Sequence, residues 1–267
     1  MTYETSSPLH YEIAGEGDVV VLGHAGFVDS RMWDDQWQAL TERYRVIRYD
    51  MQGYGQSGSV TAPISRRNEL ITLLRSLNVT QAHFIGSSLS GAIYIDVALA
   101  YPDLVSSLII ASAAPNGFQM VGQPPRYMME MFEAWQKGDL SQVTELQTRI
   151  WIDGGSREPD QIDQKLRKRV AEMNVIAVQN RTMLISDSQP ADPLDPPAVS
   201  RLDKIHCPTL IIDGELDHPE IHRAATLMAE QISNARRQTI SGAAHMPNLE
   251  KPSEFNRLVL DFLQSVK

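Results

Sequence analysis

Three residues of this 267-residue chain have the types and the order needed for nucleophilic catalysis: Ser88, Asp217 and His245. A serine hydroxyl is a weak nucleophile near neutral pH, so it needs a general base, and an acid must hold that base in one tautomer. Asp217 lies in Gly214-Glu215-Leu216-Asp217, just after one predicted strand, and His245 lies in Gly242-Ala243-Ala244-His245, just after the next. This order of nucleophile, acid and base is that of one class of hydrolytic site.

Backbone sterics choose the nucleophile within Gly86-Ser87-Ser88-Leu89-Ser90-Gly91. A nucleophile on a sharp strand-to-helix turn needs very small residues two positions before and two positions after it. Gly86 and Ser90 flank Ser88 in this way, whereas the corresponding neighbours of Ser87 are bulky. With Ser90 as nucleophile the turn would fall inside the helix. We therefore assign the nucleophile to Ser88.

Other interpretations of these residues are weaker. Ser88 alone could be a helix N-cap, but the ordered aspartate and histidine favour the catalytic interpretation. Asp213 and Glu215 are rivals of Asp217; we expect the first to lie too close to its strand and the second to point away. An acid after the run 104–111 is excluded, because the chain continues there as Ser112-Ala113-Ala114-Pro115-Asn116.

His218 and His222 are four residues apart, a spacing that can hold a metal ion on a helix. Pro219 marks the exposed start of that helix, so we expect no metal ion there. We also expect no cofactor. His24 is expected to pack within its loop.

The predicted elements bring the candidate residues to one edge of a sheet. Continuous apolar runs are typical of strands buried on both faces of a parallel sheet. Apolar runs indicate strands at 19–22, 82–85, 104–111 and 208–213, and we also predict a buried strand at 45–50, a weaker edge strand at 9–14 and a last strand at 237–240. Helical periodicity alternates with them at 33–43, 66–77 and 89–101, after Pro219, and around 255–262.

The stretch 116–200 breaks this alternation, because it contains no strand-like run. Apolar residues with helical spacing predict three helices there, and six of the 11 methionines of the chain lie within it. We therefore predict a core formed by 1–115 and 201–267, with 116–200 as a helical cap, or lid.

Composition excludes several partners. The formal net charge of -9 repels phosphate backbones, so a nucleic-acid partner is not expected. Cys207 is the single cysteine, the first 12 residues lack an apolar run like that of a signal peptide, and the longest apolar candidate is interrupted by Asp96. We expect a cytoplasmic protein without a membrane span, and the oligomeric state stays open.

Three motifs in register resemble those of the α/β-hydrolase family over nearly the whole chain: Gly23-His24-Ala25-Gly26-Phe27, the turn at Ser88, and the ordered Asp217 and His245. The resemblance implies an α/β fold with a mostly parallel sheet flanked by helices and an all-helical cap inserted after the sixth strand. It also implies an oxyanion hole with backbone N–H donors from Leu89 and Gly26, or from Phe27 in place of Gly26.

The chain departs from the family pattern at three positions. Ser90 replaces the usual glycine of the turn, so we expect some strain there, and Ala25 replaces a glycine after His24. Gln52 replaces an arginine that is common in relatives, so any ion pair of that arginine is expected to be absent.

The resemblance implies a serine hydrolase that cleaves small to medium carboxylic esters through an acyl-enzyme on Ser88. An apolar pocket between sheet and cap would be lined by Phe27, Met128, Met131, Phe132, Trp135, Trp151 and Met246. A lactonase or a carbon–carbon bond hydrolase is an alternative on the same triad, although Met246 stands where the latter often has tryptophan. A signalling receptor or stress-module protein that retains the triad is an alternative of another class.

Overall fold

The computed structural model describes residues 9–266, so the first eight residues of the predicted core and Lys267 lie outside the described range. Within it, seven strands form one sheet in the order β1-β3-β2-β4-β5-β6-β7. Only β1 is antiparallel to its neighbour, β3. The strands are β1 (Tyr11–Ala14), β2 (Val19–Gly23), β3 (Arg45–Tyr49), β4 (Ala82–Ser87), β5 (Val105–Ala111), β6 (Thr209–Gly214) and β7 (Ala235–Ile240).

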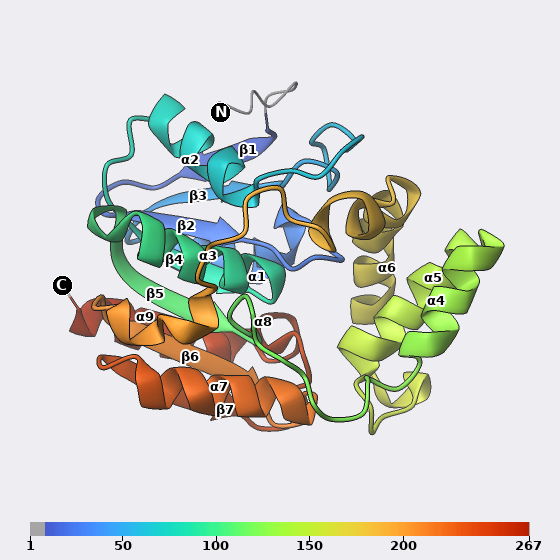
Figure 1. Ribbon diagram of the computed structural model, residues 1–267. Coiled ribbons are helices and arrows are strands. Elements are labelled where there is room, and N and C mark those ends of the chain that lie inside the picture. The colour runs from blue at the N-terminus through green and yellow to red at the C-terminus, as the bar shows by residue number, and fades with distance from the viewer. Residues whose placement is uncertain (1–8, 267) are drawn as a thin grey trace.

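Helices cover both faces of this sheet (Figure 1). The buried apolar side chains fall into one cluster on each face. One face packs against α2 (Arg66–Ser76), α3 (Leu89–Ala100) and α7 (Pro219–Gln231), and the other against α1 (Asp34–Thr41), α8 (Pro247–Glu250) and α9 (Pro252–Ser265). Because both faces are covered, the central strands are mostly apolar, which is the pattern that predicted them. The predicted α/β class with a mostly parallel sheet is confirmed.

The segment between β5 and β6 contains helices only, as the missing strand pattern predicts. It lies beyond the strand ends, on the right in Figure 1, and has an apolar cluster of its own. Its elements are α4 (Met128–Lys137), α5 (Leu140–Thr148), α6 (Gln164–Gln179), the π-helical turns η3 (Arg149–Asp153) and η5 (Met183–Asp187), and the 3-10 turns η4 (Pro159–Gln161), η6 (Ala198–Ser200) and η7 (Leu202–Lys204).

The expected insertion point after a sixth strand needs correction, because five strands precede the helical segment among residues 9–266. A single antiparallel strand, β1, precedes β2 in that range, so β5 is the strand that leads into the segment. None of the helices in the described range has both the length and the apolar composition that a bilayer span requires.

Buried ion pairs join the helical segment to the core. Arg157 Nη2 lies 2.7 Å from Glu250 Oε2, and the other oxygen of that carboxylate accepts from the backbone N–H of Ala244 at 2.8 Å. Arg157 also donates to the carbonyl of Asp153. The helical segment is therefore tied to the loop that carries His245.

Candidate active site

Ser88 occupies the turn between β4 and α3, with φ 52° and ψ -111°. A non-glycine residue rarely adopts a positive φ, and such strain persists only where neighbours enforce it. The Ser88 N–H donates to the carbonyl of Ala111 at 2.8 Å. Gly86 leaves the necessary space, because a Cβ there would lie 2.7 Å from the ring of Tyr94. The turn therefore places the Ser88 side chain beyond the end of the sheet.

Loops after two later strands bring Asp217 and His245 to Ser88. His245 Nε2 lies 3.0 Å from Ser88 Oγ, and His245 Nδ1 lies 2.9 and 3.1 Å from the two carboxylate oxygens of Asp217. A carboxylate only accepts, so Nδ1 carries the proton and Nε2 is free to accept from the serine. The imidazole of His245 is thus held in the tautomer that a general base requires.

Close backbone packing fixes the distance between the two loops. The Leu216 N–H donates to the carbonyl of Ala243 at 2.8 Å. Gly214 ends β6, and a Cβ there would lie 2.0 Å from the carbonyl oxygen of Ala244. A side chain at Gly214 would therefore separate the acid loop from the histidine loop.

Ser90 does not carry the strain expected of it. Its hydroxyl accepts from the backbone N–H of Ser87 at 2.8 Å and donates to the carbonyl of the same residue at 3.1 Å. Ser90 is not among the residues with positive φ, whereas Ser88 is. The extra side chain fits because position 23 is glycine, where a Cβ would lie 2.6 Å from that of Ser90.

The loop after β2 lies against the nucleophile turn, and His24 orients it. The Met51 N–H donates to His24 Nε2 at 2.9 Å, so His24 Nδ1 carries the proton and donates to the carbonyl of Ala25 at 2.9 Å. Desolvation lowers the pKa of His24, which keeps the ring neutral. A Cβ on Gly26 would lie 3.3 Å from Leu89 Cβ, so the two candidate oxyanion-hole segments are in contact.

An apolar cavity of about 210 Å³ opens at Ser88 and His245. Trp151, on η3, forms one wall and places its ring 4.7 Å from the imidazole of His245 and 6.1 Å from the ring of Phe27. A second hollow of about 320 Å³ shares Trp151 and His245 and extends along Asp217. Together they leave room on both sides of a group bound at Ser88.

The other expected pocket residues lie elsewhere. Met131 is buried in the apolar cluster of the helical segment, where Met128 and Trp135 pack at its edge. Phe132 is exposed, and Met246 is fully buried beneath Ser87, with its sulfur 4.0 Å from the Ser87 hydroxyl. None of these five residues lines the cavity at Ser88, and neither does the buried Phe27, so Trp151 is the one expected pocket residue among those that line it.

Several lining residues were not expected. They come from the segments directly after β5 and from the start of α7: Ser112, Ala113, Ala114, Met120, Pro125, His218 and Ile221. Their position in the sequence, after a predicted strand, could have identified them. Residues that follow a parallel strand lie at the edge where the nucleophile lies, and those after β5 were notable in the sequence only for their lack of an acid.

The rival acids and the two neighbouring histidines have other partners. Asp213 accepts from Arg237 and lies 2.5 Å from His222 Nδ1. Glu215 accepts from the hydroxyl of Ser241 at 2.7 Å. The His218 ring contacts the carbonyl of Gln123 and caps α7. Among residues 9–266, no three His, Cys, Asp or Glu side chains gather as metal ligands would.

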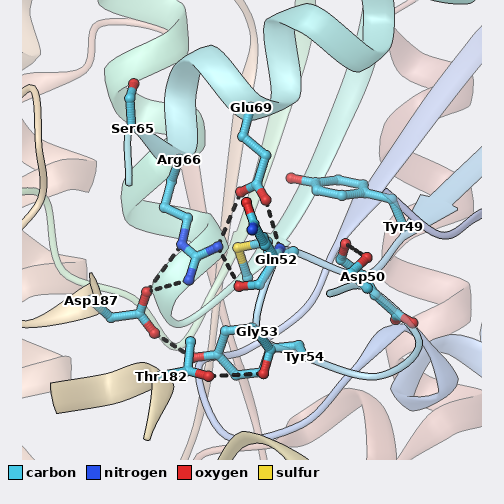
Figure 2. A network of polar contacts seen from close by, with 12 residues as sticks. Tyr49, Asp50, Gln52, Gly53, Tyr54, Ser65, Arg66, Glu69, Thr182 and Asp187 are labelled. Carbon is cyan, nitrogen blue, oxygen red and sulfur yellow. Dashed lines mark hydrogen bonds and ion pairs between the residues drawn. The ribbon is translucent and has the colours of Figure 1, made fainter. Parts of the chain in front are cut away.

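A buried polar network connects the helical segment to the loop after β3 (Figure 2). Arg66, on α2, donates to both Glu69 and the carbonyl of Gln52, at 3.1 and 2.8 Å. The same guanidinium binds Asp187 of η5 through Nε and Nη2, at 3.0 and 2.7 Å. The cation of this network is Arg66 of α2, and residue 52 contributes its backbone N–H, to Glu69, and its carbonyl, to Arg66.

Tyr54 extends this network to the loop after β2. Its hydroxyl donates to the carbonyl of Gly26 at 2.9 Å and contacts Asp187 Oδ2. Its ring meets that of His24 edge to face, with 4.8 Å between centroids. Thr182, also from the helical segment, donates to the carbonyl of Gly53 at 2.8 Å. The segment therefore contacts the site through Tyr54 as well as through Trp151.

Comparisons with known proteins agree with this architecture. A family model described as "Alpha/beta hydrolase family" matches residues 19–258. The 3-oxoadipate enol-lactonase 1 of Acinetobacter baylyi is 26% identical over 250 residues, which cover 93% of this chain and 89% of the relative. The pimeloyl-[acyl-carrier protein] methyl ester esterase of Aeromonas hydrophila is 26% identical over 258 residues, covering 93% and 96%. The crystal structure of a hydrolase from Pseudomonas aeruginosa superposes with a TM-score of 0.78 at 25% identity, covering 98% and 97%.

Proposed function

Because this chain belongs to the α/β-hydrolase family, we propose that it is a serine hydrolase of uncharged carboxylic esters, with Ser88, His245 and Asp217 as its catalytic triad. One observation carries the proposal: the hydrogen-bonded line from Ser88 through His245 to Asp217 ends in an apolar cavity. The helical segment acts as the cap of that cavity.

The reaction follows from the geometry of the triad. Ser88 Oγ attacks the ester carbonyl while its proton passes to His245 Nε2, and Asp217 stabilises the imidazolium that forms. The tetrahedral intermediate collapses as Nε2 returns the proton to the leaving alcohol, which leaves an acyl group on Ser88. A water molecule then repeats the sequence, gives up its proton to His245 and releases the acid.

The oxyanion hole is proposed to use the N–H groups of Leu89 and Gly26, with that of Phe27 as the alternative to Gly26. Leu89 is the first residue of α3, so its N–H has no acceptor within the helix. His24 binds the carbonyl of Ala25, and in a trans peptide the N–H of Gly26 points the opposite way.

The cavity supports an uncharged, apolar acyl group as the substrate class. No lysine or arginine lines the space at Ser88, and Leu89, Ala113, Met120 and Trp151 are among its walls. A carboxylate on the acyl chain would be desolvated there without a cation to pair with. The leaving alcohol must lie on the side of His245, where the second hollow opens.

Lactone hydrolysis is the second candidate, because a lactone is a cyclic ester and the A. baylyi relative is named an enol-lactonase. The same triad would open the ring and then hydrolyse the acyl-enzyme. Ring size and charge would decide whether such a substrate enters the cavity at Ser88.

The decisive experiment is a hydrolysis panel of aryl esters with acyl chains of increasing length, an ester with a terminal carboxylate, lactones and a ring-cleavage dienone. Ser88→Ala should lower turnover by a factor on the order of 10⁵ to 10⁶. Ser87→Ala is the matched control, because Ser87 is the neighbouring serine. In the described part of the chain, the hydrogen bond of its hydroxyl goes to the Met246 sulfur and not to the triad. That variant should stay within a few-fold of wild type.

Three results would contradict the proposal in different ways. Ester turnover that survives in Ser88→Ala would remove Ser88 as the nucleophile. Preference for the carboxylate-bearing ester over its uncharged counterpart would remove the substrate class. Saturable binding of the panel without turnover would favour the ligand-binding receptor.

A further inference from the structure

Both peptide planes around Gly26 are anchored through their carbonyl oxygens. His24 holds the carbonyl of Ala25, and Tyr54 holds the carbonyl of Gly26. Glycine has the widest backbone freedom of any residue, so these two bonds restrict a position that would otherwise be loose. Because C=O and N–H point in opposite directions in a trans peptide, the same bonds aim the N–H groups of Gly26 and Phe27.

The hydroxyl of Tyr54 has one hydrogen and two acceptors. One acceptor is the carbonyl of Gly26, and the other is Asp187 Oδ2 of the helical segment. Burial and the neighbouring Asp187 raise the pKa of Tyr54 well above its usual value, so the phenol keeps its hydrogen at working pH. The position of Asp187 therefore decides how that one hydrogen is shared with the oxyanion-hole loop.

Asp187 is itself held firmly. Two N–H groups of Arg66 bind its other oxygen, and the Arg66 guanidinium also lies 5.6 Å from the centre of the Tyr54 ring. Arg66, Tyr54 and Asp187 are all buried or nearly so, and Figure 2 shows the three side chains converging from α2, the loop after β3 and η5. Charge-assisted bonds in such a site are stronger and more directional than those in water.

We propose that Tyr54 is a positioning residue of the oxyanion hole, and that Asp187 and Arg66 set it, so that seating of the cap is transmitted to the N–H donors. This assignment rests on the proposed serine-hydrolase function. Tyr54 does not touch the reacting atoms. It acts through the carbonyl of Gly26, and Asp187 acts through Tyr54.

The first test compares Tyr54→Phe with Tyr49→Phe. Tyr49 is equally buried, and its hydroxyl bonds to that of Tyr94 instead of to the site. With an aryl ester, Tyr54→Phe should lower kcat by about tenfold to a hundredfold, less than the loss of a whole oxyanion-hole donor, and change KM by less than about threefold. Affinity for a boronic acid, whose adduct with Ser88 mimics the tetrahedral intermediate, should fall in parallel. Tyr49→Phe should leave kcat, KM and boronate affinity within about twofold.

The second test is a double-mutant cycle with Asp187→Asn. If Asp187 acts through Tyr54, Asp187→Asn should lower kcat, and the double variant should be no slower than Tyr54→Phe alone. Additive losses in kcat would overturn the part assigned to Asp187. Should Asp187→Asn fail to fold, the nearly isosteric Tyr54→Phe decides the assignment of Tyr54 by itself.

The failures are distinguishable. Wild-type protein without Ser88-dependent turnover overturns the proposed function, and this assignment with it. Ser88-dependent turnover in which Tyr54→Phe matches Tyr49→Phe in kcat and boronate affinity overturns the role of Tyr54 alone. A rise in the KM of Tyr54→Phe with unchanged kcat would also overturn the role of Tyr54, because that pattern indicates loss of ground-state binding.

Discussion

At the scale of single residues, the site depends on where backbone strain is placed. Ser88 holds a positive φ, while Ser90, whose side chain is larger than the glycine typical of the family, sits without strain in the first turn of α3. Ser90 instead ties the two backbone groups of Ser87 to the helix. Sequence reasoning identified the small residues that the turn needs. It could not find the compensating partner, Gly23, because that contact joins residues distant in the chain.

Ser90→Gly should therefore destabilise the protein instead of relieving strain. The variant loses both hydrogen bonds to Ser87 and adds a flexible residue to a helix, which costs about 1 to 2 kcal/mol in the free energy of unfolding. Ser90→Ala is the control that separates the lost hydroxyl from the added flexibility. Chemical denaturation of the three proteins measures the effect, and a Ser90→Gly variant as stable as wild type would restore the interpretation of strain.

At the scale of elements, the sequence predicted every strand of the described sheet to within a few residues. The central strands are short, mostly apolar runs closed by turn residues, whereas the edge strands β1 and β7 carry polar residues. The sequence did not predict the π-helical turns η3 and η5. These turns carry Trp151 and Asp187. Their sequence periodicity does not distinguish them from an ordinary α-helical turn. Four of the expected pocket residues are on α4: Met128, Met131 and Trp135 pack in the interior of the helical segment, and Phe132 is exposed. Periodicity indicates that a face is buried but does not identify what buries it.

The corner between α2 and the loop after β3 gives a prediction for Gln52→Arg. This change restores the residue common in the family, yet Arg66 already occupies the space beside Glu69 and Asp187. A second buried guanidinium there should destabilise the protein by about 1 to 3 kcal/mol. The double variant Gln52→Arg, Arg66→Gln should lose less free energy of unfolding than the two single variants lose together, by about 1 kcal/mol or more. If the two losses in free energy of unfolding simply add in chemical denaturation, the idea that an arginine at position 52 can replace Arg66 is contradicted.

At the scale of the whole molecule, carboxylates are buried where the helical segment meets the sheet and its flanking helices. Burial raises the pKa of Glu250 against the opposing effect of Arg157. Burial also raises the pKa of Asp96, on α3, to about 6. Composition predicts the net negative charge but not these sites, since Asp96 meets Asn116 and Arg67 only in the folded chain. The predicted core and cap follow from the loss of strand pattern, whereas their contacts depend on side-chain geometry.

Asp96→Asn should make the protein more stable at neutral pH, but not near pH 4. The pKa of Asp96 is about 6 in the folded protein, against about 3.9 for an unperturbed aspartate, so the folded state retains a proton that the unfolded state releases. Stability therefore falls as pH rises through this window, and the full penalty, on the order of 2 to 3 kcal/mol, is present above about pH 6. Asparagine has no such penalty. Thermal melts between pH 4 and 8 measure the difference, with the exposed Asp261→Asn as control. A constant difference across that range would refute the role of Asp96.

The contact between Trp151 and His245 has a practical consequence, because it joins a fluorophore of the cap to the imidazole of the core. Indole emission depends on the polarity of its surroundings and on the ring against which it lies. Separation of cap and core, or a ligand that comes between the two rings, therefore changes the emission of Trp151. Trp151 is therefore an intrinsic optical probe in the wall of the cavity at Ser88, and its emission follows ligand entry once that of the other three tryptophans is subtracted.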